Sequence, residues 1–406
     1  MAKQDFSKKK ALLIEDMAEA RIMQKKMLSD FGFESIHIAM KAESAIELMK
    51  SHSFDLILSD YNLGNGKDGQ QLLEEVRHTK LIPHTATYLM VTAETSIEMV
   101  MGAIEYQPDG YITKPFSQAL LQRRLSKLLD TKERLYDVNI ALDKMDYEGA
   151  ISAAKLVIEK YPSLIGRCER IIGESFLEME AYDKALLLFN NTLKNRKMPW
   201  ALFGKAKSYF LMDQLDKAEQ CFRQLMFDNR FFVSAYDWLA KIQRLQGNAT
   251  EAQATLLEAI GRSPKNILRQ VELGNVSFSL HDFITAEMAF RRAVFLAKHS
   301  CYNTPEIYLK HLESLARISD SGPLLSRYKD NFRSTLKKIH ALFSDNPSNT
   351  GKIFSYEIDL YLADQDTASA HKTLEIWLNQ VDTGNAFPPT EQQSVIYAKA
   401  FGESVE

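Results

Sequence analysis

The sequence predicts an α/β domain with a doubly wound parallel sheet, followed by an all-α solenoid of helical repeats. Residues 1–130 alternate short apolar runs with amphipathic helical patterns, whereas beyond residue 130 an alanine recurs about every 34 residues. At 406 residues, with 45% hydrophobic and 25% charged residues, the chain is long enough for two or three globular domains. This composition excludes a fibrous or disordered chain.

Charge balance and cysteine content narrow the classes of function. With 50 Lys+Arg against 53 Asp+Glu, and a net charge of −2 in residues 1–130, neither part has the basic excess of a nucleic-acid or anionic-membrane surface. The three cysteines form no CxxC pair, which argues against a disulfide framework or a zinc site. No apolar run approaches the roughly 18 residues of a membrane span. We therefore expect a cytoplasmic protein with no nucleic-acid partner and no membrane partner.

The first 130 residues predict five β-α units. Each predicted strand is a short run of apolar or β-favouring residues, as in strands covered on both faces, and each predicted helix is amphipathic. The strands are expected at Ala11–Ile14, Ser35–Ala39, Asp55–Ser59, Thr87–Thr92 and Asp109–Thr113. The helices are expected at Met17–Asp30, Ala42–Ser51, Gly69–His78, Ser96–Ile104 and Gln118–Leu129. Strands that alternate with helices in this way form a doubly wound parallel sheet.

Polar side chains follow the predicted strands at their carboxyl ends, where chemistry collects in such sheets. They are Glu15 and Asp16 after the first strand, Asp60 after the third, Thr92 at the end of the fourth and Lys114 after the fifth. Three carboxylates at one edge repel one another, so we expect either raised pKa values or a hard divalent cation such as Mg²⁺. With that charge screened, Asp60 can attack a phosphoryl donor as a nucleophile, while Lys114 stabilises the transferring oxygens.

Four motifs at these strand ends resemble the receiver domain of bacterial two-component response regulators. The motifs are LIED at residues 13–16, LILSDYNL at 56–63, VTAE at 91–94 and GYITKPF at 110–116. They occur in order and at the spacing of that family, and all five signature positions are filled. The resemblance implies a flavodoxin-like (βα)5 fold and a function in phosphorelay signal transduction.

By position, the resemblance also implies a role for each site residue. Asp60 would accept a phosphoryl group from a sensor histidine kinase or phosphotransfer protein, with Mg²⁺ as the cofactor. The Mg²⁺ ligands would be Glu15, Asp16, Asp60 and the backbone carbonyl of Asn62. Thr92 and Lys114 would contact the phosphoryl oxygens, and Tyr111 would be the aromatic switch residue that moves inward when Thr92 moves.

The sequence departs from the family pattern in the loop after the acceptor. Gly64 stands where the family usually has proline, and the loop at residues 64–69 is one residue longer than is common. We therefore expect an altered loop geometry beside an intact acceptor. The polar pair Asn62 and Glu94, two residues beyond the acceptor and the threonine, resembles that of members with a short-lived aspartyl phosphate. We expect a transient phosphoryl state.

Two other interpretations of this site stay open. A receiver that keeps these residues can serve, without phosphorylation, as the docking or dimerisation module of a scaffold or adaptor. Haloacid-dehalogenase phosphatases use a similar aspartate, threonine and lysine, but they have a second carboxylate two residues after the nucleophile, where Asn62 stands here. We expect no enzymatic activity beyond self-phosphorylation and autodephosphorylation of the receiver.

An alanine pattern organises residues 131–300. Its members, at intervals of 35, 33, 34 and 34 residues, are Ala150, Ala185, Ala218, Ala252 and Ala286. A large apolar residue follows most of these alanines four residues later, and glycine or alanine stands twelve residues before the last four. Antiparallel helices approach closely only where small residues face each other, and the large residue fills the space against the next unit. The pattern resembles about five tetratricopeptide repeats, which implies protein–protein binding.

Residues 301–406 stay helical and apolar but lose this register. Residues 361–374 resemble one further, divergent repeat. Helix breakers stand at Ser321-Gly322-Pro323, Asp345-Asn346-Pro347 and Phe387-Pro388-Pro389. The predicted organisation is therefore a receiver domain at 1–130, repeats at 131–300, and divergent helical pairs with a cap at 301–406.

The first helices of the repeats are expected to line a concave groove that binds an unidentified protein partner. The register projects into it Trp200, Phe203, Lys207, Phe210, Asp237, Lys241, Arg244, Val271, Asn275 and Phe278. Mixed apolar and charged groups suit a peptide or helix of another protein, although half of these aromatics can instead pack between repeats. A homodimer also stays open, and the balanced charge disfavours a DNA-binding output.

The junction between the two parts is expected to be stiff. No glycine or proline interrupts residues 117–148. The last receiver helix is therefore expected to run directly, or through a cap at Asp130 with Glu133, into the first repeat helix. Such a junction would transmit a change in the receiver to the repeats.

Overall fold

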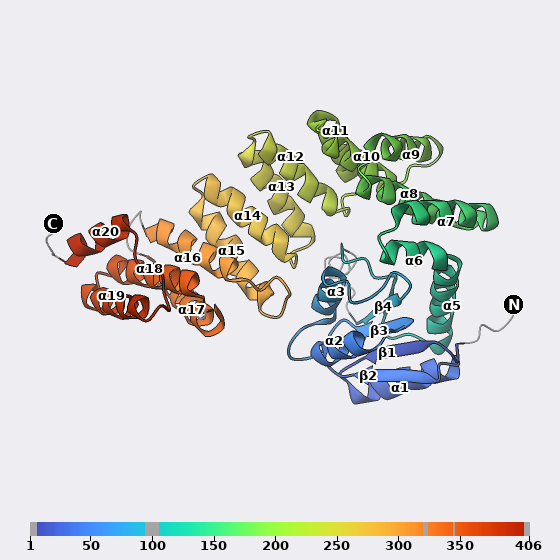
Figure 1. Cartoon of the computed structure of the whole chain (residues 1–406), viewed down its shortest axis with the longest axis horizontal. Helices are drawn as coiled ribbons and strands as arrows, with labels where there is room; N and C mark the ends of the chain where they lie inside the picture. The colour runs from blue at the N-terminus through green and yellow to red at the C-terminus, as the bar shows by residue number, and fades with distance from the viewer. Residues whose placement is uncertain (1–5, 94–104, 320–323, 344–345, 402–406) are drawn as a thin grey trace. The chain divides into compact units, whose positions relative to one another are not determined.

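The computed structural model of the chain describes residues 6–93, 105–319, 324–343 and 346–401 and has two compact units (Figure 1). The first unit contains Met1–Gly247, Glu258–Lys265 and His299–Cys301. The second unit contains Asn248–Leu257, Asn266–Lys298 and Tyr302–Glu406. Among the described residues, none of the helices combines the length and the hydropathy that crossing a membrane requires.

A five-stranded parallel sheet, in the order β2-β1-β3-β4-β5, forms the centre of the N-terminal part. The strands are β1 (Lys10–Ile14), β2 (Ser35–Ala39), β3 (Leu56–Asp60), β4 (Thr87–Thr92) and β5 (Gly110–Thr113). The helices around it are α1 (Ala18–Asp30), α2 (Ala42–Ser51), α3 (Gly69–His78) and α5 (Gln118–Arg134). The predicted doubly wound α/β fold is confirmed. The helix expected at Ser96–Ile104 lies outside the described residues.

Alternate residues along each strand pack against opposite helical layers. Leu12 and Met90 belong to the apolar cluster that the sheet forms with α2 and α3. Leu13 and Val91 belong to the cluster that it forms with α1 and α5. Since both faces are covered, the central strands are continuous apolar runs in the sequence, and the first polar side chain of each run marks the sheet edge.

The receiver part continues into the helical part without a loop. Helix α5 runs on to Arg134, and α6 (Tyr136–Asp143) begins after the single residue Leu135. The continuous junction that the sequence predicts is therefore present. The expected cap at Asp130 with Glu133 is wrong, because the helix passes through both residues and ends beyond them.

The loop before β4 holds this junction in place. Lys132 of α5 donates a hydrogen bond from Nζ to the carbonyl of His84 (2.6 Å) and pairs with Oδ1 of Asp109 (2.9 Å). The amide of His84 donates to Oδ1 of Asp143 in α6 (2.7 Å). The end of α5 and the start of the helical part are thus tied to the same side of the sheet.

Helices account for the rest of the described chain. They are α7 (Tyr147–Lys160), α8 (Ile165–Glu178), α9 (Tyr182–Asn195), α10 (Pro199–Leu211), α11 (Leu215–Asp228), α12 (Ser234–Leu245), α13 (Ala249–Arg262), α14 (Ile267–Ser279), α15 (Phe283–Ala297), α16 (Pro305–Ser319), α17 (Ser326–Phe343), α18 (Pro347–Ala363), α19 (Thr367–Asp382) and α20 (Glu391–Phe401). The breaker at residues 321–323 lies outside the described residues, whereas Pro347 begins α18 and residues 387–389 lie between α19 and α20. Helices α16 to α20 therefore occupy most of the described chain beyond residue 301.

The steric basis of the alanine pattern is visible in the packing. All five repeat alanines are fully buried. The ring of Phe189, one turn after Ala185, lies so close to Gly173 and Gly204 that a Cβ atom on either glycine would overlap it. A Cβ atom on Gly274 would lie 2.6 Å from Cζ of Phe290. Small residues thus face large ones at the expected positions.

A buried polar network joins α15, α16 and α17 in the second unit. Oε1 of Glu287, which is 2% exposed, accepts hydrogen bonds from Nε of Arg291 (3.0 Å) and Nδ2 of Asn331 (3.0 Å). His311 lies 3.3 Å from the same oxygen through Nε2 and 2.9 Å from Oγ1 of Thr335 through Nδ1. Burial lowers the pKa of His311 below its usual value.

We expect the stability of this unit to fall as the pH drops below about 6.5, because the unfolded imidazole protonates near its ordinary pKa while the buried one resists protonation. Thermal unfolding of the whole chain across this pH range, followed by calorimetry, measures the effect. His311→Gln is expected to flatten the pH dependence, whereas His371→Gln, at a half-buried position outside this network, is the matched control and should leave it unchanged. An unaltered pH dependence in His311→Gln would contradict this account.

Candidate functional site

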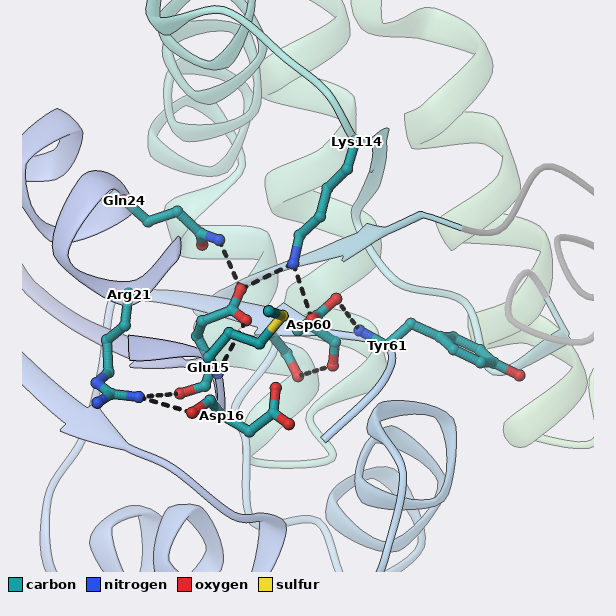
Figure 2. A network of polar contacts seen from close by, with 9 residues as sticks. Glu15, Asp16, Arg21, Gln24, Asp60, Tyr61 and Lys114 are labelled. Atoms are coloured by element: carbon teal, nitrogen blue, oxygen red, sulfur yellow. Dashed lines mark hydrogen bonds and ion pairs between the residues drawn. The ribbon is translucent and has the colours of Figure 1, made fainter. Parts of the chain in front are cut away.

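Three carboxylates from two strands meet at the carboxyl edge of the sheet (Figure 2). Glu15 and Asp16 follow β1, Asp60 ends β3, and one oxygen of each lies within 4.8 Å of the others. The two strands are hydrogen-bonded neighbours, with Ile14 opposite Ser59, so their ends are adjacent. Within the described ranges, no other group of three such side chains meets this criterion.

The ammonium group of Lys114 lies between two of these carboxylates (Figure 2). Its Nζ donates to Oδ2 of Asp60 (2.8 Å) and to Oε2 of Glu15 (2.9 Å). The backbone places it there, since Lys114 follows β5 and its amide donates to the carbonyl of Thr92 (2.6 Å) at the end of β4. Thr92 itself is 1% exposed. Four strand ends thus contribute to one site.

Burial sets the electrostatics of the acceptor. Asp60 is 6% exposed, and this burial, opposed by Lys114 and reinforced by the charge of Glu15, raises its pKa to about 6. Burial also disfavours the charged form of Lys114, but hydrogen bonds and charge from Asp60 and Glu15 outweigh it and raise the pKa of that ammonium. A cation that binds between carboxylates this close together reduces the electrostatic repulsion between them.

Helix α1 holds the acidic pair through two residues that the sequence did not single out. Gln24 donates from Nε2 to Oε2 of Glu15 (2.7 Å), and Nη1 of Arg21 donates to the backbone carbonyls of Glu15 and Asp16 (3.0 Å each). Gln24 and Leu28, four residues apart, are the buried residues of α1. A polar residue on that buried face was the available signal.

The loop after the acceptor explains one departure from the family pattern. Gly64 has φ of +72°, and a Cβ atom there would lie 3.0 Å from Oδ2 of Asp16. Proline, with φ fixed near −65°, cannot adopt this conformation. The loop as it stands therefore needs a residue such as glycine at this position, and it brings the loop backbone close to an acidic side chain. Asn62 is exposed at the start of this loop.

Helix α3 begins directly against the backbone of the acceptor. The amide of Gly69 donates to the carbonyl of Tyr61 (2.7 Å), and a Cβ atom on Gly69 would overlap the carbonyl oxygen of Asp60. Asp68 caps the helix, its Oδ1 accepting from the amide of Gln71 (2.8 Å). The β3–α3 segment is thus tightly built around the acceptor.

Two further receiver residues, Tyr111 and Glu94, were singled out by the sequence. Tyr111 is half-buried on β5, paired with Met90, and packs against the apolar cluster under α2 and α3. Glu94 lies outside the described residues.

Several predicted groove residues pack between helices instead of facing a partner. The ring of Phe203 lies 5.7 Å from that of Phe222 and 5.0 Å from that of Phe232. Trp200 lies edge-on to Phe189 at 6.3 Å. For these two aromatics, the alternative of packing within the repeats is the one that the structure supports.

A second aromatic group surrounds Trp238 of α12, a half-buried residue that the projection did not include. Phe210 lies 5.0 Å from the Trp238 ring, and the ammonium groups of Lys207 and Lys241 lie 5.5 Å and 5.1 Å from it. We call these four residues the Trp238 surface. Trp238 directly follows the projected Asp237 on α12.

The other predicted groove residues do not join this group. Asp237 is half-buried and Arg244 exposed on α12. Val271, Asn275 and Phe278 lie on α14 in the second unit, where the ammonium of Lys310 is 5.2 Å from the Phe278 ring.

Comparison with known proteins assigns both parts of the chain. Residues 11–126 match the response regulator receiver domain, and residues 200–226 and 233–266 each match a tetratricopeptide repeat. The chemotaxis protein CheY-3 of Vibrio cholerae serotype O1 is 32% identical over 121 residues, 30% of this chain and 92% of that protein. The chemotaxis protein CheY of Pseudomonas aeruginosa is 31% identical over 121 residues, 30% of this chain and 96% of that protein.

Among solved structures, a CheY-like receiver domain protein from Methanospirillum hungatei is 25% identical, covers 31% of this chain and 97% of its own, and superposes with a TM-score of 0.29. The sequence relatives thus span the sheet-containing part, and the repeat matches lie beyond it. The chain belongs to the response regulators, with a receiver domain at its N-terminus followed by tetratricopeptide repeats.

Proposed function

We propose that Asp60 accepts a phosphoryl group from a sensor histidine kinase or phosphotransfer protein, and that this controls protein binding by the repeats. The observation that carries the proposal is the convergence of three carboxylates and the Lys114 ammonium at one sheet edge. Receiver-domain proteins of this family serve phosphorelay signalling and are generally non-catalytic. We propose that the chain divides into a receiver domain at residues 1–130, tetratricopeptide repeats at 131–300, and divergent helical pairs with a cap at 301–406.

The transfer itself needs a nucleophile and charge stabilisation. An oxygen of Asp60 attacks the phosphorus of a phosphohistidine, an O–P bond forms and the P–N bond breaks. The donor imidazole keeps the electron pair of that bond and takes up a proton. Lys114, which is hydrogen-bonded to Asp60, is placed to stabilise the negative charge that develops on the transferring oxygens. We assign Thr92, at the adjacent strand end, as the second hydrogen-bond donor to these oxygens.

The donor set at this edge fits Mg²⁺. Receiver domains bind Mg²⁺ at an acidic pocket, and hard oxygen donors within 4.8 Å of one another are the ligands that this ion prefers. We assign the ligands to Glu15, Asp16, Asp60 and the backbone carbonyl of Asn62. When bound, the ion supplies charge neutralisation for the transferring phosphoryl group. Tyr111 is the aromatic residue that we expect to respond to movement of Thr92.

The output that we propose is protein binding at the repeats. The Trp238 surface combines an aromatic platform with two lysines, which suits an acidic peptide or helix. The junction between α5 and α6 has no loop, and contacts with His84 hold both helices. This supports transmission of a conformational change from the receiver to the repeats, because no flexible linker separates them. Tetratricopeptide repeats imply protein partners in general; a homodimer stays a prediction.

Asp60→Asn is expected to abolish phosphoryl incorporation, because the neutral amide lacks the anionic carboxylate oxygen that attacks phosphorus. The purified chain is incubated with acetyl phosphate and Mg²⁺, and intact mass measures the added phosphoryl group. Asp183→Asn, an exposed change on α9, is the matched control and should incorporate normally. Absence of incorporation in the unaltered protein would favour the unphosphorylated adaptor.

The double variant Glu15→Gln with Asp16→Asn is expected to weaken Mg²⁺ binding by at least about tenfold, because two of the hard anionic ligands are lost. Isothermal titration calorimetry of the full chain measures the affinity. Glu19→Gln, an exposed change in the first turn of α1, serves as the control. Equal affinities in the control and the double variant would place the ion elsewhere.

The aspartyl phosphate is expected to be short-lived, because the polar pair Asn62 and Glu94 resembles that of family members that lose the phosphoryl group quickly. Its decay after removal of acetyl phosphate is followed in the purified protein by phosphate-affinity gels. A lifetime of many hours would contradict the expectation.

A further inference from the structure

Two residues from the repeat region contact the receiver segment that follows Asp60. The Nζ atom of Lys265 donates to Oη of Tyr61 (3.0 Å), lies 5.2 Å from the centre of its ring and is 4.0 Å from Oδ2 of Asp68. Ser300 donates from Oγ to Oε2 of Glu74 (2.8 Å). All of these residues belong to the first compact unit, although 204 positions separate Lys265 from Tyr61 and 226 separate Ser300 from Glu74.

Tyr61 connects this contact to the acceptor. Its amide donates to Oδ1 of Asp60 (2.8 Å), and its phenol donates to Oε1 of Gln70 (3.0 Å) while accepting from Lys265. The side chain is 4% exposed and belongs to the apolar cluster under α2 and α3. A single buried residue therefore contacts both the carboxylate that is to be phosphorylated and a lysine of the repeat region.

The receiver side of the contact is acidic and desolvated. Burial raises the pKa of Asp68, against the charges of Lys265 and His299, and burial likewise raises the pKa of Glu74, against hydrogen bonds from Tyr106 and Ser300. Removing carboxylates from water is unfavourable unless partners replace the water. Lys265 and Ser300 supply such partners, so the contact is chemically matched on both sides.

The acceptor is enclosed in a way that makes this contact sensitive to its state. Asp60 is 6% exposed, Gly64 leaves little room above Asp16, and Gly69 packs on the carbonyl of Asp60. A phosphoryl group on Asp60 changes the size and charge of the group that the amide of Tyr61 contacts. The segment that begins at this amide, residues 61–74, carries all three receiver residues of the contact.

We propose that Lys265 and Ser300 form a latch that holds the two loops carrying them on the β3–α3 segment, and that phosphorylation of Asp60 opens it. The proposal rests on the proposed role of Asp60. While the latch is closed, Lys265 stays bonded to Tyr61 and Ser300 to Glu74. Opening exposes Asp68 and Glu74 and frees the loops at Lys265 and Ser300.

Hydrogen exchange of the full chain, read by mass spectrometry with and without beryllofluoride and Mg²⁺, tests the latch. We expect beryllofluoride to speed exchange severalfold in residues 61–78 and in 258–266 together with 298–304. Lys265→Ala should produce the same increase without beryllofluoride. Lys217→Ala, an exposed lysine on α11 that pairs with Gln214, is the matched control and should not.

Linkage supplies a second measurement. If beryllofluoride opens the latch, then Lys265→Ala and Ser300→Ala must each bind beryllofluoride more tightly, by about fivefold or more, because opening no longer opposes binding. Failure of the unaltered chain to take up beryllofluoride or phosphate would overturn both the latch and the role of Asp60. Uptake without faster exchange in these segments, or with unchanged affinity in both variants, would overturn the latch alone.

Discussion

The ion pairs of Lys114 are the interactions on which the site depends. One ammonium group pairs with two carboxylates that the sheet places side by side, and the backbone amide of Lys114 is hydrogen-bonded to the end of β4. Strand order, strand register and the length of each strand must all be right for these three side chains to meet. The apolar clusters on both faces of the sheet fix that geometry, so the chemistry at the sheet edge depends on the packing of the core.

Most of the receiver fold could be predicted because its strands are buried on both faces. Residues 56–58 have no polar side chain that would obscure the strand, and the first carboxylate after them marks the sheet edge. The end of α5 was harder to place. Residues 130–134 are polar and carry a plausible cap, yet contacts of Lys132 with His84 and Asp109 keep the segment helical. Tertiary contacts of this kind leave no mark on local sequence.

The site residues show the same limit. The charged groups at the strand ends could be found because topology alone brings them together, whereas Gln24 and Arg21 act from a helix whose rotation the sequence does not determine. In the repeats, register predicted which alanines are buried but not how the aromatic rings pack. Phe203 of α10 and Trp238 of α12 lie edge-on to each other at 6.5 Å, and this contact depends on how the helices pack.

The shared position of Phe189 has a mechanical consequence for the array. Its ring fills the space against glycines of both α8 and α10, so three successive helices meet at one rigid aromatic side chain. Bending the stack at this point would press the Phe189 ring against Gly173 or Gly204, with which it is already in close contact. A load applied at one end of these helices is therefore passed along the stack, and curvature must change by small shared rotations over many units.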